Sequence, residues 1–172
     1  MTLFGYNTDV AFGNDTYHVQ TELRSAEHAI ETHVFVKGRS VGKRSSSYSD
    51  NATGDVQQLL RMQHKNVVEE VRAGKLPGSG HELSIQCLNE EDVLTGDAPT
   101  LTVRVCEAEQ PIDGALVTLR FGFGYDNPIY SQGVSNEQGT AELALDPEQH
   151  STTVSVRARH GDSLAIRHLH LP

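Results

Sequence analysis

This sequence has no long apolar run and no secretion signal, and it has few cysteines. No segment approaches the roughly 18 consecutive apolar residues that a membrane-spanning helix needs, so we expect no membrane partner. The N-terminal segment MTLFGYNTDV has neither the basic region nor the apolar stretch of a secretory signal. Two cysteines in 172 residues do not form a disulfide framework. Together these absences predict a cytoplasmic protein.

The two cysteines are expected to be free thiols. Strand alternation places Cys87 on an apolar face with Leu83 and Ile85. The same alternation places Cys106 on the polar face of its own strand. Because side chains on opposite faces seldom reach disulfide geometry, we predict no bridge between them.

Basic residues are scarce in the second half of the chain. Residues 81–172 contain fourteen Asp and Glu but five Lys and Arg, which accounts for the whole net charge of −9. Residues 1–80 contain nine of each and are neutral. A field of one sign disfavours nucleic acid and anionic membranes as partners of the second half.

A glycine-rich segment divides the chain. The run GKLPGSG ends a helical pattern, and residues 75–81 are predicted to be a linker between a module at 1–74 and another at 82–172. Alternation and turn residues in the first module predict an antiparallel β-meander followed by one helix, an α+β module. The predicted strands are 8–12, 16–23, 29–37 and 41–48, and the predicted helix is 56–73.

The second module has the pattern of an antiparallel β-sandwich, so the fold class is mainly β. Short alternating segments separated by turn residues predict it. The predicted strands are 83–88, 101–106, 115–121, 139–145, 152–159 and 163–171, and no helix is predicted there.

Three runs in this module carry a family resemblance: QPIDGALVTL at 110–119, SNEQGTAEL at 135–143 and VSVRA at 154–158. With them, residues 82–172 resemble the transthyretin-like and carboxypeptidase-regulatory-like (Ig-like) sandwiches. The resemblance implies an adhesive, accessory or stabilising domain. One enzymatic branch, the hydroxyisourate hydrolases, ends in Tyr-Arg-Gly-Ser. This chain ends in HLHLP, so no catalytic residue is carried over.

Histidines on the meander suggest a metal hypothesis. His18 lies on the polar face of its strand, and Glu31 and His33 lie on the polar face of the next strand. If Gln20 pairs with Glu31, His18 lies opposite His33, and two imidazoles with a carboxylate could bind zinc. A solvated polar sheet face is the competing interpretation. We predict no cofactor for the chain.

The segment 37–48 concentrates basic side chains. Lys37, Arg39, Lys43, Arg44 and Tyr48 are residue types that hold phosphate backbones and stack on bases. The alternative interpretation is an exposed hairpin whose bases protect an edge strand from aggregation.

Aromatic residues alternate along the segment after residue 120. Phe123 and Tyr125 are candidates for a partner-binding loop, and core packing is the alternative for the phenylalanine.

Three further histidines have structural interpretations. His168 and His170 are expected on the outward, polar face of the last strand, between inward-facing leucines. His64, near the apolar stripe of the helix, is expected to be a hydrogen-bonded core or boundary residue.

Three functions remain open from the residues alone. The first is a non-enzymatic accessory or assembly protein, because the sequence has no nucleophile elbow, paired-carboxylate motif or CxxC, and an edge strand can be extended by another protein or a second copy. The second is binding of single-stranded nucleic acid or anions by the basic hairpin, which charge disfavours. The third is a metal-dependent hydrolase at the His18/His33 face.

Overall fold

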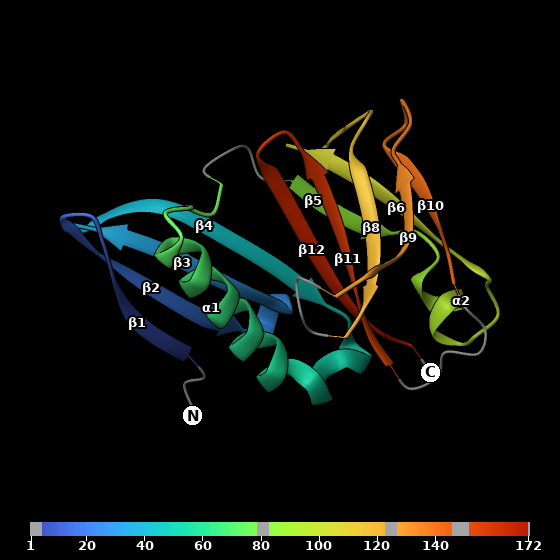
Figure 1. Ribbon diagram of the computed structural model, residues 1–172. Coiled ribbons are helices and arrows are strands. Elements are labelled where there is room, and N and C mark those ends of the chain that lie inside the picture. The colour runs from blue at the N-terminus through green and yellow to red at the C-terminus, as the bar shows by residue number, and fades with distance from the viewer. Residues whose placement is uncertain (1–4, 79–82, 123–126, 146–151, 172) are drawn as a thin grey trace. The chain divides into compact units, whose positions relative to one another are not determined.

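The computed structural model describes residues 5–78, 83–122, 127–145 and 152–171. The chain divides into two compact units, Met1–Ser79 and Gly80–Pro172, and the division falls within the segment 75–81. Strands dominate both units (Figure 1), so the prediction of a mainly β fold is confirmed. Among the described residues, no helix combines the length and the apolar character that crossing a bilayer requires.

The N-terminal unit is an antiparallel meander of four strands with one long helix, α1, packed against β1, β2 and β3 (Figure 1). The strands are β1 Gly5–Phe12, β2 Asp15–Arg24, β3 Ala29–Val36 and β4 Arg39–Tyr48. The helix α1 spans Val56–Arg72, after the 3-10 turn η2 at Asp50–Asp55. A second 3-10 turn, η1 at Ser25–Glu27, joins β2 to β3. The meander and the helix are therefore confirmed, although β1 begins earlier than the predicted residue 8.

Turns determine how these strands pair. Lys37 and Gly38 both have positive φ angles, 50° and 77°, as in the two-residue hairpin turns that match the twist of paired strands. His28, at φ 47°, closes the β2–β3 connection with a backbone hydrogen bond to Ser25. β2 and β3 consequently pair Arg24 with Ala29 and continue in register from there.

Valine dominates the core between α1 and the sheet. Burial of each such side chain contributes roughly 1.5–2 kcal/mol to the free energy of unfolding. The buried members of this core are Val10, Val19, Val34, Val67, Val68 and Val71. The helix provides its share from one apolar stripe, as the sequence pattern predicts.

The C-terminal unit has two antiparallel sheets around one core (Figure 1). One sheet has the order β12-β11-β8-β9, and the other has the order β10-β6-β5 with β7 beside β6. The strands are β5 Leu83–Cys87, β6 Thr100–Glu107, β7 Gln110–Pro111, β8 Leu116–Phe121, β9 Ile129–Val134, β10 Thr140–Ala144, β11 Thr152–His160 and β12 Ser163–Leu171. Inward-facing leucines and valines of both sheets fill the space between them.

Three elements of this unit differ from the prediction: the two-residue strand β7, a short helix and the strand β9. A short helix, α2, spans Glu90–Leu94, where only a turn was expected. Acidic residues fill its first turn, where the helix dipole favours negative charge, and the Asn89 side chain bonds the backbone of Thr100 and Thr102. The strand β9 was also not predicted, because its segment contains Gly133 and alternates poorly.

The cysteines agree with the prediction. Cys87 and Cys106 are both free. Cys87 packs against the core of its unit, as expected from alternation.

His168 corrects the prediction for the last strand. Leu169 and Leu171 are buried as expected, but His168 on the opposite face is only 3% exposed, not outward in solvent. Alternation identifies the face on which a residue lies, but it does not tell whether that face is covered. Ile166, on the same face and also 3% exposed, is the residue that indicates a covered face.

Burial changes the acid-base behaviour of this histidine. Desolvation, with the nearby charges of Arg157 and Arg167, lowers the pKa of His168 from 6.5 to about 3. No hydrogen-bond partner of its Nδ1 is present among the described residues. The imidazole is therefore neutral in the folded protein at neutral pH.

The protein should become less stable as pH falls below about 6.5. In that range the unfolded chain binds a proton at His168 that the folded chain does not bind until about pH 3. Each pH unit inside the window should lower the free energy of unfolding by at most about 1.4 kcal/mol. Urea unfolding at a series of pH values measures this slope.

The variant His168→Gln removes the titrating group and should flatten the slope between pH 6.5 and 4.5, whatever its effect on stability at pH 7. His160→Gln, at the exposed end of β11, is the matched control and should leave the slope unchanged. An equal slope in all three proteins would contradict the assignment.

Candidate functional site

A buried polar network lies between α1 and the sheet. The Gln63 amide nitrogen donates to the Ile30 carbonyl at 3.1 Å and the Thr32 hydroxyl at 3.1 Å, with a longer contact to the Arg44 carbonyl at 3.3 Å. The Ser46 hydroxyl donates to the Gln63 carbonyl oxygen at 2.5 Å. Gln63 is only 1% exposed, and both polar atoms of its side chain have hydrogen-bond partners.

His64 extends this network to the first two strands. Its Nε2 lies 2.8 Å from the Thr8 hydroxyl and its Nδ1 lies 2.8 Å from the Thr21 hydroxyl. The ring of Tyr6 stacks on it at 5.5 Å between centroids. Desolvation lowers the pKa of His64, so the neutral ring, one nitrogen donating and one accepting, is the stable form. The expectation of a hydrogen-bonded core histidine is confirmed.

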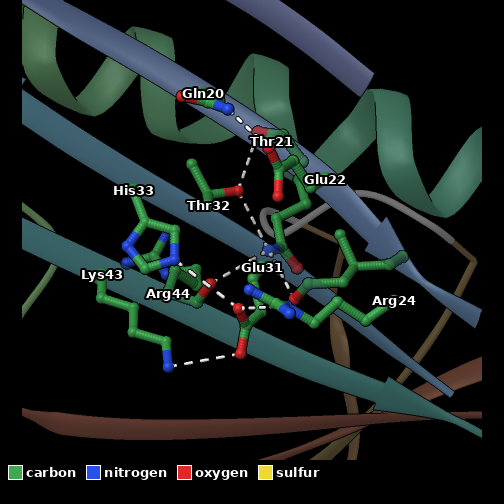
Figure 2. Close-up of polar contacts among 11 residues, drawn as sticks. Gln20, Thr21, Glu22, Arg24, Glu31, Thr32, His33, Lys43 and Arg44 are labelled. Carbon is green, nitrogen blue, oxygen red and sulfur yellow. Dashed lines mark hydrogen bonds and ion pairs between the residues drawn. The ribbon is translucent and has the colours of Figure 1, made fainter. Parts of the chain in front are cut away.

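The opposite face of the meander carries an ion-pair cluster centred on Glu31. Figure 2 shows Arg24, Lys43 and His33 pointing toward this carboxylate. The distances are 2.7 Å to Arg24 Nε, 3.3 Å to Lys43 Nζ and 3.6 Å to His33 Nε2. Burial acts to raise the pKa of Glu31, but hydrogen bonds and charge from Arg24 and Lys43 outweigh it, so the pKa lies below its ordinary value.

The strand pairing assumed for the metal hypothesis is wrong. Gln20 pairs with His33, not with Glu31, and His18 lies opposite Phe35. The four-residue connection through η1 and His28 shifts the register by two positions. His18 is instead held by Asp9, with Nδ1 and Oδ1 2.5 Å apart.

His33 and Glu31 do lie together, but His18 does not join them. In the described parts of the chain, no group of three or more His, Cys, Asp or Glu side chains is placed to hold a metal ion. Glu31 is engaged by two cations, which is the arrangement of a solvated ion-pair cluster.

The basic hairpin residues lie on two faces. Lys43 contacts Glu31 on the outward face, while Arg44 forms a two-pronged ion pair with Glu70 of α1, at 2.7 and 3.0 Å, on the other face. Lys37 contacts Asp15 at 3.1 Å. A continuous basic surface needs these charges on one side and available to a ligand.

The remaining members of that group differ from one another. Arg39 is exposed at the start of β4. Tyr48 is 3% exposed, with its ring against His28, and burial together with Asp50 raises its pKa. A buried tyrosine does not offer the exposed ring on which a base stacks. Phe123 and Tyr125, the candidate loop residues, lie outside the described residues.

The strand β1 is an open sheet edge that the sequence interpretation did not locate. Within each unit, the outer strands are β1 and β4 of the meander, β12 and β9 of one C-terminal sheet, and β10 and β5 of the other. β4 contains Arg39, Lys43 and Arg44 and its pairing with β3 has a register shift, and β12 contains Arg167. β5 and β10 have five residues each, and the pairing of β9 contains a register shift. β1 has eight residues, pairs with β2 without a break and contains no Lys, Arg or Pro. Natural edge strands usually carry one of these protections.

The edge at β9 is also closed by its surroundings. The backbone N–H of Ala144 in β10 donates to the Ser131 hydroxyl at 2.9 Å, and a Cβ on Gly133 would lie 3.0 Å from the Glu142 carbonyl oxygen. β10 therefore lies against β9 beside the sandwich core. Among the outer strands of the described chain that contain no Lys, Arg or Pro, β1 is the longest, and it is paired without a break.

Exposed apolar residues gather on β8 and β9 of the C-terminal unit. Four of the seven exposed large hydrophobic residues in the described chain lie on β8 and β9: Leu116, Ile129, Tyr130 and Val134. Leu116 pairs with Val134, so these two are adjacent. Scattered exposed side chains of this kind are common on protein surfaces and do not define a partner. The backbone of β1, by contrast, is itself a binding element.

Comparisons with known proteins give only distant similarities. No protein-family model and no curated protein sequence matches the chain. Among solved structures, it is similar to the Arg-specific cysteine proteinase gingipain R, with 14% identity and a TM-score of 0.38 over 53% of this chain and 18% of that chain. It is also similar to the BSP domain of a biofilm-associated protein, with 12% identity and a TM-score of 0.34 over 91% of this chain and 20% of that chain.

Both of these proteins are β-rich in the matched region, and the chain covers about a fifth of each. Similarity at this level supports no functional argument. None of the comparisons confirms the transthyretin-like resemblance of residues 82–172.

Replacing Gln63 by leucine should destabilise the N-terminal unit by about 2 to 3 kcal/mol. The change keeps the side-chain size similar but leaves the Ser46 and Thr32 hydroxyls without their amide partner, and a buried unpaired polar group costs about 1 to 3 kcal/mol. Thermal or urea unfolding followed by circular dichroism measures the loss.

Gln57→Leu is the matched control, because Gln57 lies on the exposed face of the same helix. It should change the free energy of unfolding by no more than about 0.5 kcal/mol. Equal effects of the two substitutions would show that the network does not stabilise α1 on the sheet.

Proposed function

We propose that this protein is a non-enzymatic assembly protein that binds another protein chain along β1. The observation that carries the proposal is the open edge itself, eight regular residues, Gly5–Phe12, without a lysine, arginine, proline or bulge. A strand added there would pair with the backbone N–H and C=O groups on the free side of β1.

The inward side chains of β1 prepare it for such pairing. Thr8 bonds His64, Tyr6 stacks on the same ring and Val10 is 2% exposed in the core. These contacts hold the strand extended before a partner arrives. A pre-ordered strand has less conformational entropy to lose on binding.

The outward side chains of β1 leave room for a partner. Gly5, Asn7, Asp9 and Ala11 are small or polar, and all four are exposed. None of them carries a long side chain across the edge. The side chains on one face therefore hold β1 against α1, while its free edge stays accessible to a partner strand.

Three described residues with reactive side chains, Cys87, His64 and His168, are held in unreactive states, which supports a non-enzymatic role. Burial, together with Glu90, raises the pKa of Cys87 to about 12, the opposite of what a nucleophilic thiol needs. Both ring nitrogens of His64 are hydrogen-bonded to threonine hydroxyls, and His168 is buried.

The C-terminal sandwich would then act as a spacing module. Its excess of acidic residues, fourteen against five bases in residues 81–172, favours solubility and repels nucleic acid. Its buried leucines and valines form one core between two sheets, which suits a spacing module.

A photo-reactive amino acid at Asn7 should form a light-dependent adduct with another protein chain when the full chain is expressed in its own cells. Asn7 is exposed on β1, so an added strand would lie within reach of its side chain. Mass spectrometry of the adducts identifies the attached chain, a second copy included.

The matched control places the same group at Glu137, an exposed turn residue between β9 and β10, and should yield no adduct. Absence of any adduct specific to Asn7 would overturn the proposal.

Cys87 should react very slowly with disulfide reagents at pH 8. With a pKa of about 12, its thiolate fraction there is about a thousandfold below that of an ordinary cysteine. A Cys106→Ser variant isolates the signal of Cys87, and denaturation in urea should restore a rapid reaction. Fast labelling of the folded variant would reopen the question of a nucleophile.

A further inference from the structure

We infer that the chain bound at β1 is a second copy of this protein, paired antiparallel with Thr8 on the two-fold axis. This inference rests on the proposed function and names its partner. It follows from three properties of β1: the alternation of its faces, the position of its one charge and the location of α1.

Symmetry restricts how β1 can pair with itself. In an antiparallel pair, residues directly opposite each other point to the same face of the sheet. A two-fold axis perpendicular to the sheet must therefore pass through a residue position. For the strand Gly5–Phe12, the longest overlaps have the axis at Thr8 or at Asp9.

Charge selects between these two registers. With the axis at Asp9, the two Asp9 carboxylates lie directly opposite each other, which is destabilising. With the axis at Thr8, each Asp9 lies opposite Asn7 of the second copy, whose amide can donate a hydrogen bond to it. On the inner face, the same register places Tyr6 opposite Val10, an aromatic and β-branched pair that is favourable in sheets.

Asp9 has an oxygen available for this contact. Its Oδ1 is engaged by His18 Nδ1 at 2.5 Å, and the Asp9 side chain is 69% exposed. The other carboxylate oxygen can accept the Asn7 amide of the second copy, because a carboxylate accepts several hydrogen bonds.

The position of α1 is compatible with a symmetric pair. α1 packs over β1, β2 and β3, so its axis lies more than one strand spacing, which is about 4.8 Å, from a two-fold axis set just outside β1. The helix of the second copy would therefore lie on the same face of the joined sheet without overlapping the first.

Sedimentation equilibrium of the full chain at about 0.15 M salt tests the inference, with a dimer expected for the unchanged protein. Asn7→Asp places two carboxylates opposite each other at two symmetric positions and should raise the dimer Kd about tenfold. Asn7→Lys creates two opposite-charge pairs and should lower the Kd several-fold. Asp9→Asn should leave the Kd unchanged or raise it.

Gln138→Asp, in an exposed turn of the C-terminal unit, is the matched control for added negative charge and should not change the Kd. Circular dichroism of each variant checks that the fold is kept. If Asp9→Asn tightens the dimer and both Asn7 variants leave it unchanged, the axis lies at Asp9 and the stated register is wrong. A dimer insensitive to all three variants would place the interface elsewhere and overturn the inference.

The outcome for the partner is separable from the outcome for the proposed function. A chain that stays monomeric at every concentration, with Asn7 adducts to a different protein, removes the second copy but keeps assembly through β1. A monomer without Asn7 adducts removes both.

Discussion

The placement of α1 on the N-terminal sheet depends on two polar side chains that cannot be left unpaired. Gln63 and His64 are buried at positions where an apolar side chain would need no hydrogen bonds. Each forms its hydrogen bonds with residues of specific strands. A slip of the helix by one turn would leave an amide, an imidazole and several hydroxyls without hydrogen bonds, at a cost of some kcal/mol for each group. The apolar contacts bring the helix to the sheet, and the polar contacts select one position.

Much of this fold could be predicted from local sequence patterns. Alternation at 16–23 and the turn at Lys37-Gly38 predict strands that the structure contains, because both depend on neighbouring residues alone. The helix at Val56–Arg72 follows from its apolar stripe in the same way. The free cysteines follow from which face of a strand each one occupies.

Features that depend on distant parts of the chain were not predictable from those patterns. The pairing of Gln20 with His33 depends on how many residues the connection at η1 uses, and a change of two moves every cross-strand neighbour. The burial of His168 depends on what covers a face, which alternation does not contain. Whether β1 is an edge strand depends on the strand order of the sheet. The absence of lysine and proline from β1 is informative only once β1 is known to be an outer strand.

The alternation along β1 separates two kinds of selection. One face of β1, with Tyr6, Thr8 and Val10, contacts α1, so substitutions there are constrained by the stability of the fold. Asn7 and Ala11 lie on the other face of the sheet and are exposed, so folding constrains them less. Single substitutions at these exposed positions could therefore change the binding partner during evolution without changing the fold. Sequence divergence among homologues should concentrate on every second residue of this strand.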